Sequence, residues 1–150
     1  MQDILVIEPT EDRSILIGST KSTIMVNSTE TSGRYSLIEH ALPPQTSGQP
    51  LHVHQHYSHA WYILAGEIEL TCDEKIIQAG AGTFVFVPRG TNHSLRNSGN
   101  EPARILEIDS PGGLEHYYKE LGSAFLEGTP VDTSTVAALQ HKYDTYLITK

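Results

Sequence analysis

A histidine-rich segment, residues 51–59, constrains this chain more than any other part of its sequence. His52 and His54 are two residues apart, and on a β-strand side chains at this spacing point to the same face. Two imidazoles on one face can bind a single metal ion. His59 has the opposite phase, so a turn or bulge just before it must redirect its side chain. A further ligand, His93, must come from another strand that folds back over the first.

Short apolar runs follow one another from Ile4 to about Asp109, with turn residues between them. Runs of this length and spacing are typical of an all-β barrel or sandwich. Glycine-rich segments, such as residues 79–82, predict the turns. The predicted strands are Ile4–Ile7, Ser14–Gly18, Thr23–Val26, Tyr35–Glu39, Trp61–Leu64, Glu67–Thr71, Thr83–Val87 and Ala103–Ile108.

The pattern changes after Gly113, where apolar residues recur at helical spacing. One apolar stripe runs from Leu114 to Phe125, and a second predicted helix begins near Asp132. Both helices must pack an apolar face on the barrel or on a neighbouring subunit. A length of 150 residues fits one domain, so we expect a barrel over about residues 14–110 and a helical segment over about residues 112–147.

The charge of the chain argues against nucleic acid as a partner. With 10 basic and 18 acidic residues the net charge is -8, which repels a phosphate backbone. No apolar run reaches the length of a transmembrane helix, and the first residues lack a secretory leader, so we expect a cytoplasmic protein with no membrane partner. The single cysteine, Cys72, excludes an intramolecular disulfide.

Two motifs give this sequence its resemblance to a known family. The second of them, a fixed spacing of glycine, proline, glycine, histidine and asparagine, is complete here, and the first has a histidine where a glutamate is usual. On these residues the chain resembles the cupin superfamily, and more narrowly the single-domain quercetin-dioxygenase-like cupins (cupin 2 conserved barrels). The motif residues are His52, His54, His59 and Gly66, followed by Gly82, Pro88, Gly90, His93 and Asn97.

The resemblance implies an all-β, double-stranded β-helix (a cupin or jelly-roll barrel) with two short C-terminal helices. It also implies one divalent transition metal ion, which could be Fe, Mn, Ni, Co, Cu or Zn, held by His52, His54, His59 and His93. A homodimer is the family expectation, and the predicted strand Ile4–Ile7 could pair with a neighbour's sheet edge.

The histidine in place of glutamate changes the expected chemistry. Four neutral imidazoles leave a divalent ion with its full charge, whereas a carboxylate would cancel part of it. The replacement at His59 also removes a general base, which makes a flavonol substrate doubtful. Protons compete with a metal for imidazole, so the reference pKa predicts that metal affinity falls as pH drops through about 6.

Aromatic residues near the motifs predict a largely apolar pocket for a small-molecule substrate. An equally good interpretation is that they form ordinary barrel core. The candidates for substrate contact are Tyr35, His56, Trp61, Tyr62, Phe84 and Phe86. Among them, Tyr35, His56 and Tyr62 could also act as an acid or base beside the metal. The remaining histidines, His40, His116 and His141, are interpreted as ordinary surface or core residues.

Two classes of function fit these features. The first is a mononuclear metal enzyme, an oxidoreductase of the dioxygenase type acting on a small organic substrate, with aromatic compounds among the candidates. A metal-dependent isomerase or lyase is its enzymatic rival. The second is a cupin that binds a small ligand without catalysis, since one fold hosts many functions. No catalytic residue is assigned by the sequence, and oxygen uptake would separate the two classes.

Overall fold

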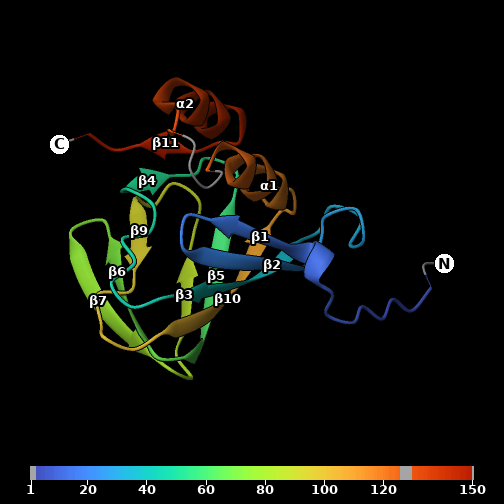
Figure 1. Cartoon of the computed structure of the whole chain (residues 1–150), viewed down its shortest axis with the longest axis horizontal. Helices are drawn as coiled ribbons and strands as arrows, with labels where there is room; N and C mark the ends of the chain where they lie inside the picture. Colours follow the sequence, from blue (N-terminus) through green and yellow to red (C-terminus); the bar gives the residue numbers. More distant parts are fainter. Residues whose placement is uncertain (1–2, 126–129, 150) are drawn as a thin grey trace.

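A computed structural model describes residues 3–125 and 130–149 of the chain. Its strands form two antiparallel sheets that face each other, and two helices pack together at one end (Figure 1). This arrangement confirms the predicted all-β barrel with two C-terminal helices. No helix in these described ranges combines the length and apolar character that crossing a membrane requires.

The larger sheet has six strands in the order β1-β2-β3-β10-β5-β8. Every pairing in it is antiparallel, and β10 lies at its centre between β3 and β5. The short helix η1 (Glu11–Arg13) precedes it. Its strands are β1 (Ser14–Ile17), β2 (Thr20–Val26), β3 (Ser36–Leu42), β5 (Ser58–Ala65), β8 (Phe84–Val87) and β10 (Ala103–Ser110).

The smaller sheet has five strands in the order β11-β4-β9-β6-β7. The last strand of the chain, β11, closes one edge by pairing with β4, so the C-terminal segment lies beside the histidine-rich segment. The strands of this sheet are β4 (His52–Val53), β6 (Glu67–Cys72), β7 (Lys75–Gly80), β9 (His93–Arg96) and β11 (Tyr146–Leu147).

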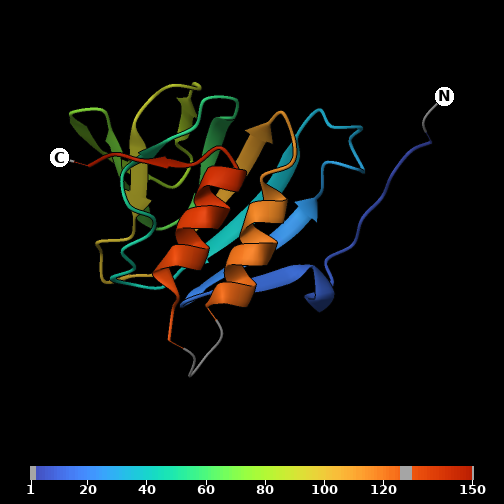
Figure 2. The same cartoon turned by 90° about the horizontal axis from the view of Figure 1, so that it is seen from above.

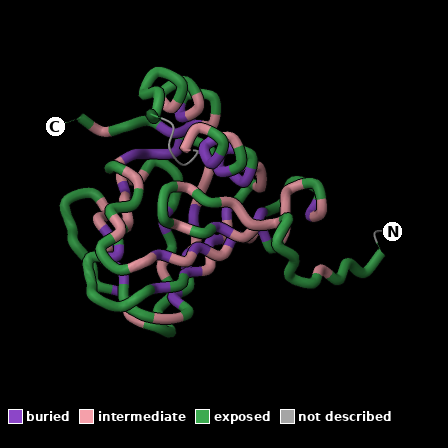
Figure 3. Tube along the Cα trace, viewed as in Figure 1, coloured by how far each residue is buried: buried purple, intermediate pink, exposed green. Residues whose placement is uncertain are grey.

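Side chains that alternate inward along each strand fill the space between the sheets. Figure 3 colours the buried residues of these strands purple. On β6 the predicted dry face is confirmed, because Ile68 and Leu70 are completely buried. On β10 the same alternation buries Ala103 and Ile105. The core therefore closes one end of the barrel and leaves the other end for the histidines.

The two helices lie side by side against the open end of the barrel (Figure 2). Helix α1 (Glu115–Ala124) and helix α2 (Thr133–Lys142) each begin within one residue of their predicted positions. Asp132 caps α2, since its side chain accepts the backbone N–H of Ser134. The stripe on α1, including Tyr117 and Leu121, packs on Ile38 of β3.

The structure differs from the strand predictions at the N-terminus and at residues 79–82, and it adds β7 and β11, which were not predicted. Residues 3–10 form no strand, and Ile4 is 95% exposed, so the predicted strand Ile4–Ile7 is wrong for this chain alone. This segment has no neighbouring strand to pair with and extends away from the barrel (Figure 1). The predicted turn at residues 79–82 begins later, because Ala79 and Gly80 complete β7 opposite β6.

Candidate metal centre

Four buried histidines meet at the open end of the barrel, and they come from three strands and one connecting loop. His52 lies on β4 directly opposite His93 of β9, which confirms that a second strand folds back over the first. His54 follows the end of β4, and the chain then turns before β5 begins, so that His59 points inward. One ring nitrogen from each side chain lies within 4.8 Å of those of the other three.

Each ring holds its Nδ1 atom in a hydrogen bond to the surrounding protein. Three of these atoms face backbone carbonyl oxygens: His52 at 2.7 Å from Pro50, His54 at 2.9 Å from Asp144, and His93 at 2.8 Å from Thr91. A carbonyl oxygen can only accept, so these Nδ1 atoms carry the proton and the Nε2 atoms keep a free lone pair. This is the tautomer that a metal ligand needs.

The four side chains fit a divalent metal ion. An ion with bonds of about 2.1 Å to nitrogen separates opposite ligands by about 4.2 Å, so small inward movements of the rings bring all four nitrogens within reach. The Nε2 atom of His93 is buried and has no hydrogen-bond partner. A buried polar atom without a partner is costly, and a metal ion would provide that partner. The protein groups that would contact the ion are all imidazole nitrogens.

Burial keeps three of the four rings neutral. It lowers the pKa of His52 to about 4, and the pKa of His54 and of His93 to about 3. His59 differs, because the carboxylates of Glu107 and Asp109 outweigh the effect of burial and raise its pKa. The cluster therefore contains three rings that resist protonation and one that is paired with negative charge.

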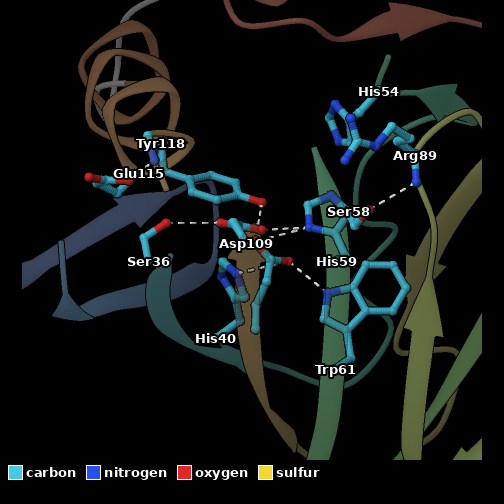
Figure 4. A network of polar contacts seen from close by, with 12 residues as sticks. Ser36, His40, His54, Ser58, His59, Trp61, Arg89, Asp109, Glu115 and Tyr118 are labelled. Atoms are coloured by element: carbon cyan, nitrogen blue, oxygen red, sulfur yellow. Dashed lines mark hydrogen bonds and ion pairs between the residues drawn. The ribbon is translucent and has the colours of Figure 1, made fainter. Parts of the chain in front are cut away.

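Two buried carboxylates that were not predicted from the sequence, Glu107 and Asp109, lie beside His59. Figure 4 shows Asp109 next to the ring of His59. Asp109 lies 2.6 Å from the Nδ1 atom of His59, and Glu107 accepts hydrogen bonds from Trp61 at 2.7 Å and Tyr118 at 2.8 Å. The sequence does contain a sign of their burial, because both acidic residues have the same strand phase as the buried Ile105. Acidic side chains on a dry face indicate a functional or paired site.

The carboxyl end of the chain also orients the ligands. The side chain of Asp144 accepts the backbone N–H groups of Gln55 at 2.9 Å and His56 at 2.6 Å, while its carbonyl oxygen faces the ring of His54. Gly90, which has a positive φ of 82°, donates its N–H to the carbonyl oxygen of His54 at 2.7 Å. The turn before His93 is therefore tied to the loop that carries His54.

A cavity of about 650 Å³ extends from the histidines to the two helices. Its walls include His52, His59 and His93 at one end and Tyr117 and Leu121 of α1 at the other. Its surface is mainly apolar. A volume of this size suits a small organic molecule.

The structure divides the predicted substrate residues into two groups. Trp61 lines the cavity, stacks on the ring of His59 and is almost completely buried. Tyr62 faces outward because it is the next residue on β5, and Phe84 and Phe86 share the outer face of β8. These three are 43%, 60% and 59% exposed. They are placed outside the cavity, which corrects their expected position.

The other two predicted substrate residues also lie outside this cavity. His56 is exposed in the loop between β4 and β5, where its backbone N–H, and not its ring, contacts Asp144. Tyr35 is 41% exposed and lines a separate hollow on the outer side of β2. Neither Tyr35 nor His56 is among the described residues that line the cavity, so neither ring is placed to act as an acid or base on a ligand there.

Comparison with known proteins places this geometry in context. A family model described as the cupin domain matches residues 38–109, which include all four histidines, Glu107 and Asp109. A solved structure, a Cupin 2 conserved barrel domain protein from Salinispora arenicola, superposes with a TM-score of 0.59 at 15% identity and covers 93% of this chain and 99% of that chain. This likeness shows the fold.

Curated relatives share part of their length with this chain. Quercetin 2,3-dioxygenase of Bacillus subtilis is 29% identical over 117 residues, which are 77% of this chain and 34% of that protein. Alginate biosynthesis protein AlgA of Pseudomonas putida is 29% identical over 84 residues, which are 56% of this chain and 17% of that protein. The chain therefore spans about a third or less of the length of these relatives.

Proposed function

We propose that this chain is a metal-dependent oxidoreductase of the dioxygenase type acting on a small organic, aromatic substrate. The chain belongs to the cupin superfamily. The observation that carries the proposal is the set of four buried histidines, whose Nδ1 atoms are all engaged by the protein and whose ring nitrogens converge on one point. The likeness to quercetin 2,3-dioxygenase supports the reaction class.

The protein's own groups divide the work at this site. His52, His54, His59 and His93 would hold one divalent ion, such as Fe, Mn, Ni, Co, Cu or Zn. When bound, the ion supplies Lewis-acid chemistry and, if it is redox-active, one-electron chemistry. Trp61 and the helices α1 and α2 form much of the cavity wall, and the carboxylate of Asp109 fixes the orientation of His59.

A metal-dependent isomerase or lyase is the second candidate. One observation favours it: His40 and Glu107 line the same cavity as the metal-site histidines, and the Nε2 atom of His40 lies 3.5 Å from a carboxylate oxygen of Glu107. Such a pair can move a proton on a substrate without oxygen. Turnover in the absence of oxygen would favour this candidate over the first.

Metal analysis followed by oxygen uptake tests the proposal. Protein purified without a chelating tag is analysed for metal, and oxygen consumption is then followed with a panel of small phenols and other aromatics. We expect oxygen uptake that requires the metal and disappears in His93→Ala, whereas the exposed control His56→Ala keeps it. Metal-loaded protein that consumes no oxygen with any member of the panel would contradict the dioxygenase proposal.

A homodimer also belongs to this proposal. The outer face of β5 and β8 exposes Tyr62, Phe84 and Phe86, and Tyr62 lies directly opposite Phe84 in the sheet. An exposed group of large apolar side chains is typical of a protein interface. Light scattering should give twice the chain mass for the wild type, and Phe84→Ser should shift the equilibrium toward the monomer. A monomeric wild type at micromolar concentration would contradict the dimer.

A further inference from the structure

His40 is a buried histidine of the cavity wall that does not belong to the metal-site set. It lies on β3 with 7% of its surface exposed, and its Nδ1 atom is 2.7 Å from the hydroxyl of the fully buried Ser22. Its Nε2 atom is buried and makes no hydrogen bond of good geometry; its nearest charged neighbour is the Oε2 atom of Glu107, 3.5 Å away. At this distance the two groups are only weakly paired, so a ligand group that reaches both of them would gain a hydrogen bond.

The cavity offers no positive side chain to a charged ligand. Its described lining contains neither lysine nor arginine, and the carboxylate of Glu107 is part of the wall. A phosphate or carboxylate group near His40 would lie beside this negative charge without a basic partner. The remaining wall is largely apolar, with Leu42, Ile105 and Tyr117 among its members. At the His40 end, away from the proposed metal ion, these features favour an uncharged group on the ligand.

The groups around His40 favour a hydroxyl at this position. The Oε2 atom of Glu107 accepts from the indole N–H of Trp61 at 2.7 Å and lies 3.5 Å from the Nε2 atom of His40. Its other oxygen accepts from the hydroxyl of Tyr118 at 2.8 Å. A ligand hydroxyl can donate to a carboxylate and can also donate to, or accept from, the imidazole, whichever tautomer Ser22 selects. A carbonyl or an ether oxygen can only accept.

We propose that this cavity binds an uncharged, apolar molecule with a hydroxyl group, and that His40 recognises this hydroxyl beside Glu107 while the rest of the molecule extends toward the four histidines. The inference rests on the proposed function, because it takes the cavity to be the substrate site. It assigns His40 as a specificity-determining residue. It also argues against a sugar phosphate whose phosphate group lies beside His40, because the described lining has no basic side chain there.

Three probes of matched shape test this assignment by calorimetry under nitrogen: 4-tert-butylphenol, tert-butylbenzene and 4-tert-butylphenyl phosphate. We expect the phenol to bind about tenfold more tightly than either of the others, the gain of one buried hydrogen bond. In His40→Phe, which keeps a ring and removes its nitrogens, the preference for phenol over hydrocarbon should disappear. His40→Gln should restore part of it, and the exposed control His141→Phe should match the wild type.

Metal content, measured on the same samples, distinguishes this inference from the proposed function. Wild-type protein that takes up no metal ion but still prefers the phenol would contradict the proposed metal enzyme and support the role of His40. Metal-loaded protein that binds the three probes equally, binds the phosphate best, or binds none of them up to millimolar concentration would overturn the inference. An unchanged preference in His40→Phe would overturn it too.

Discussion

The Nδ1 atom of His59 lies 2.6 Å from the Oδ1 atom of Asp109, and both side chains are buried. The other three metal-site histidines face backbone carbonyl oxygens instead. A carboxylate behind a metal ligand orients the ring and makes it a stronger donor. Burial and the neighbouring Glu107 raise the pKa of Asp109 to about 7, so above that pH Asp109 supplies negative charge behind the ligand that stands where related motifs have a glutamate.

Asp109→Asn should weaken metal binding while the barrel stays folded. The amide keeps the shape of the side chain and removes its charge, and loss of such a partner typically lowers metal affinity by about 10- to 100-fold. Competition with a coloured chelator measures this affinity directly. Asp3→Asn, in the exposed N-terminal segment, is the control for loss of one negative charge. Equal affinities in wild type and Asp109→Asn would show that the carboxylate has no part in the site.

The metal-free protein should lose stability as pH falls from 7 to 5. Burial lowers the pKa of His52 to about 4, and those of His54 and His93 to about 3, whereas all three titrate near 6.5 in the unfolded chain. The unfolded chain therefore binds more protons below about pH 6.5, and the free energy of unfolding decreases with falling pH. His59 and Asp109, whose pKa values are raised, act in the opposite direction; burial and Glu107 raise that of Asp109 to about 7.

Thermal melting at a series of pH values checks this dependence. His54→Gln removes one of the three depressed groups, so its melting temperature should change less between pH 7 and 5 than that of the wild type. The same lowered pKa values move proton competition for the metal below the pH of about 6 that free histidine predicts. Parallel curves for wild type and variant would mean that His54 is not buried in its neutral form.

Asp144 should stabilise both the fold and the metal site. Asp144→Gly keeps the positive φ of 56° accessible but removes the acceptor for the N–H groups of Gln55 and His56. Both hydrogen bonds are only partly buried, so water can replace part of the lost acceptor, and each lost bond costs about 0.5–1.5 kcal/mol. Urea denaturation should show this loss, and Asp144→Asn, which keeps one acceptor, should lie between the variant and the wild type. A full loss in Asp144→Asn as well would point to charge as the cause.

The effect of substituting an aromatic residue on stability should depend on whether the residue is buried, and not on its being aromatic. Trp61→Phe removes a buried N–H that donates to Glu107, so we expect a loss of about 1–3 kcal/mol in the free energy of unfolding. Phe86→Ser, on the exposed outer face of β8, should change the stability of the monomer by less than about 0.5 kcal/mol. Denaturation at low protein concentration measures both. A larger loss for Phe86→Ser would place its ring in the core.

The parts of the fold that depend on local pattern were predictable from sequence. His52 and His54 share a face because of their spacing, and the helices follow from apolar periodicity and from Asp132 as a cap. The direction of Phe84 and Phe86 was not predictable, since Val85 and Val87 make both faces of β8 equally apolar. Only the neighbouring strands decide which face is buried.

The groups that orient the metal-site histidines could not be predicted from local sequence patterns. Asp144 binds Gln55 across 89 residues of sequence, and its position depends on how β11 pairs with β4. Glu107 and Asp109 had a local signal, but acidic residues on a strand are usually solvent-exposed, and their burial depends on His59 and Trp61 from β5. Similarly, His40 could be distinguished from an ordinary core histidine only once the cavity was known.

The metal content of His93→Ala tests the central claim most directly. Elemental analysis of wild type, His93→Ala and the control His56→Ala, each purified without a chelating tag and offered the same divalent ions, compares a buried ligand with an exposed neighbour. We predict about one ion per chain for the wild type and the control, and a large loss in His93→Ala with an unchanged circular dichroism spectrum. Full occupancy in His93→Ala, or a wild type that binds none of the ions, would contradict the four-histidine metal site.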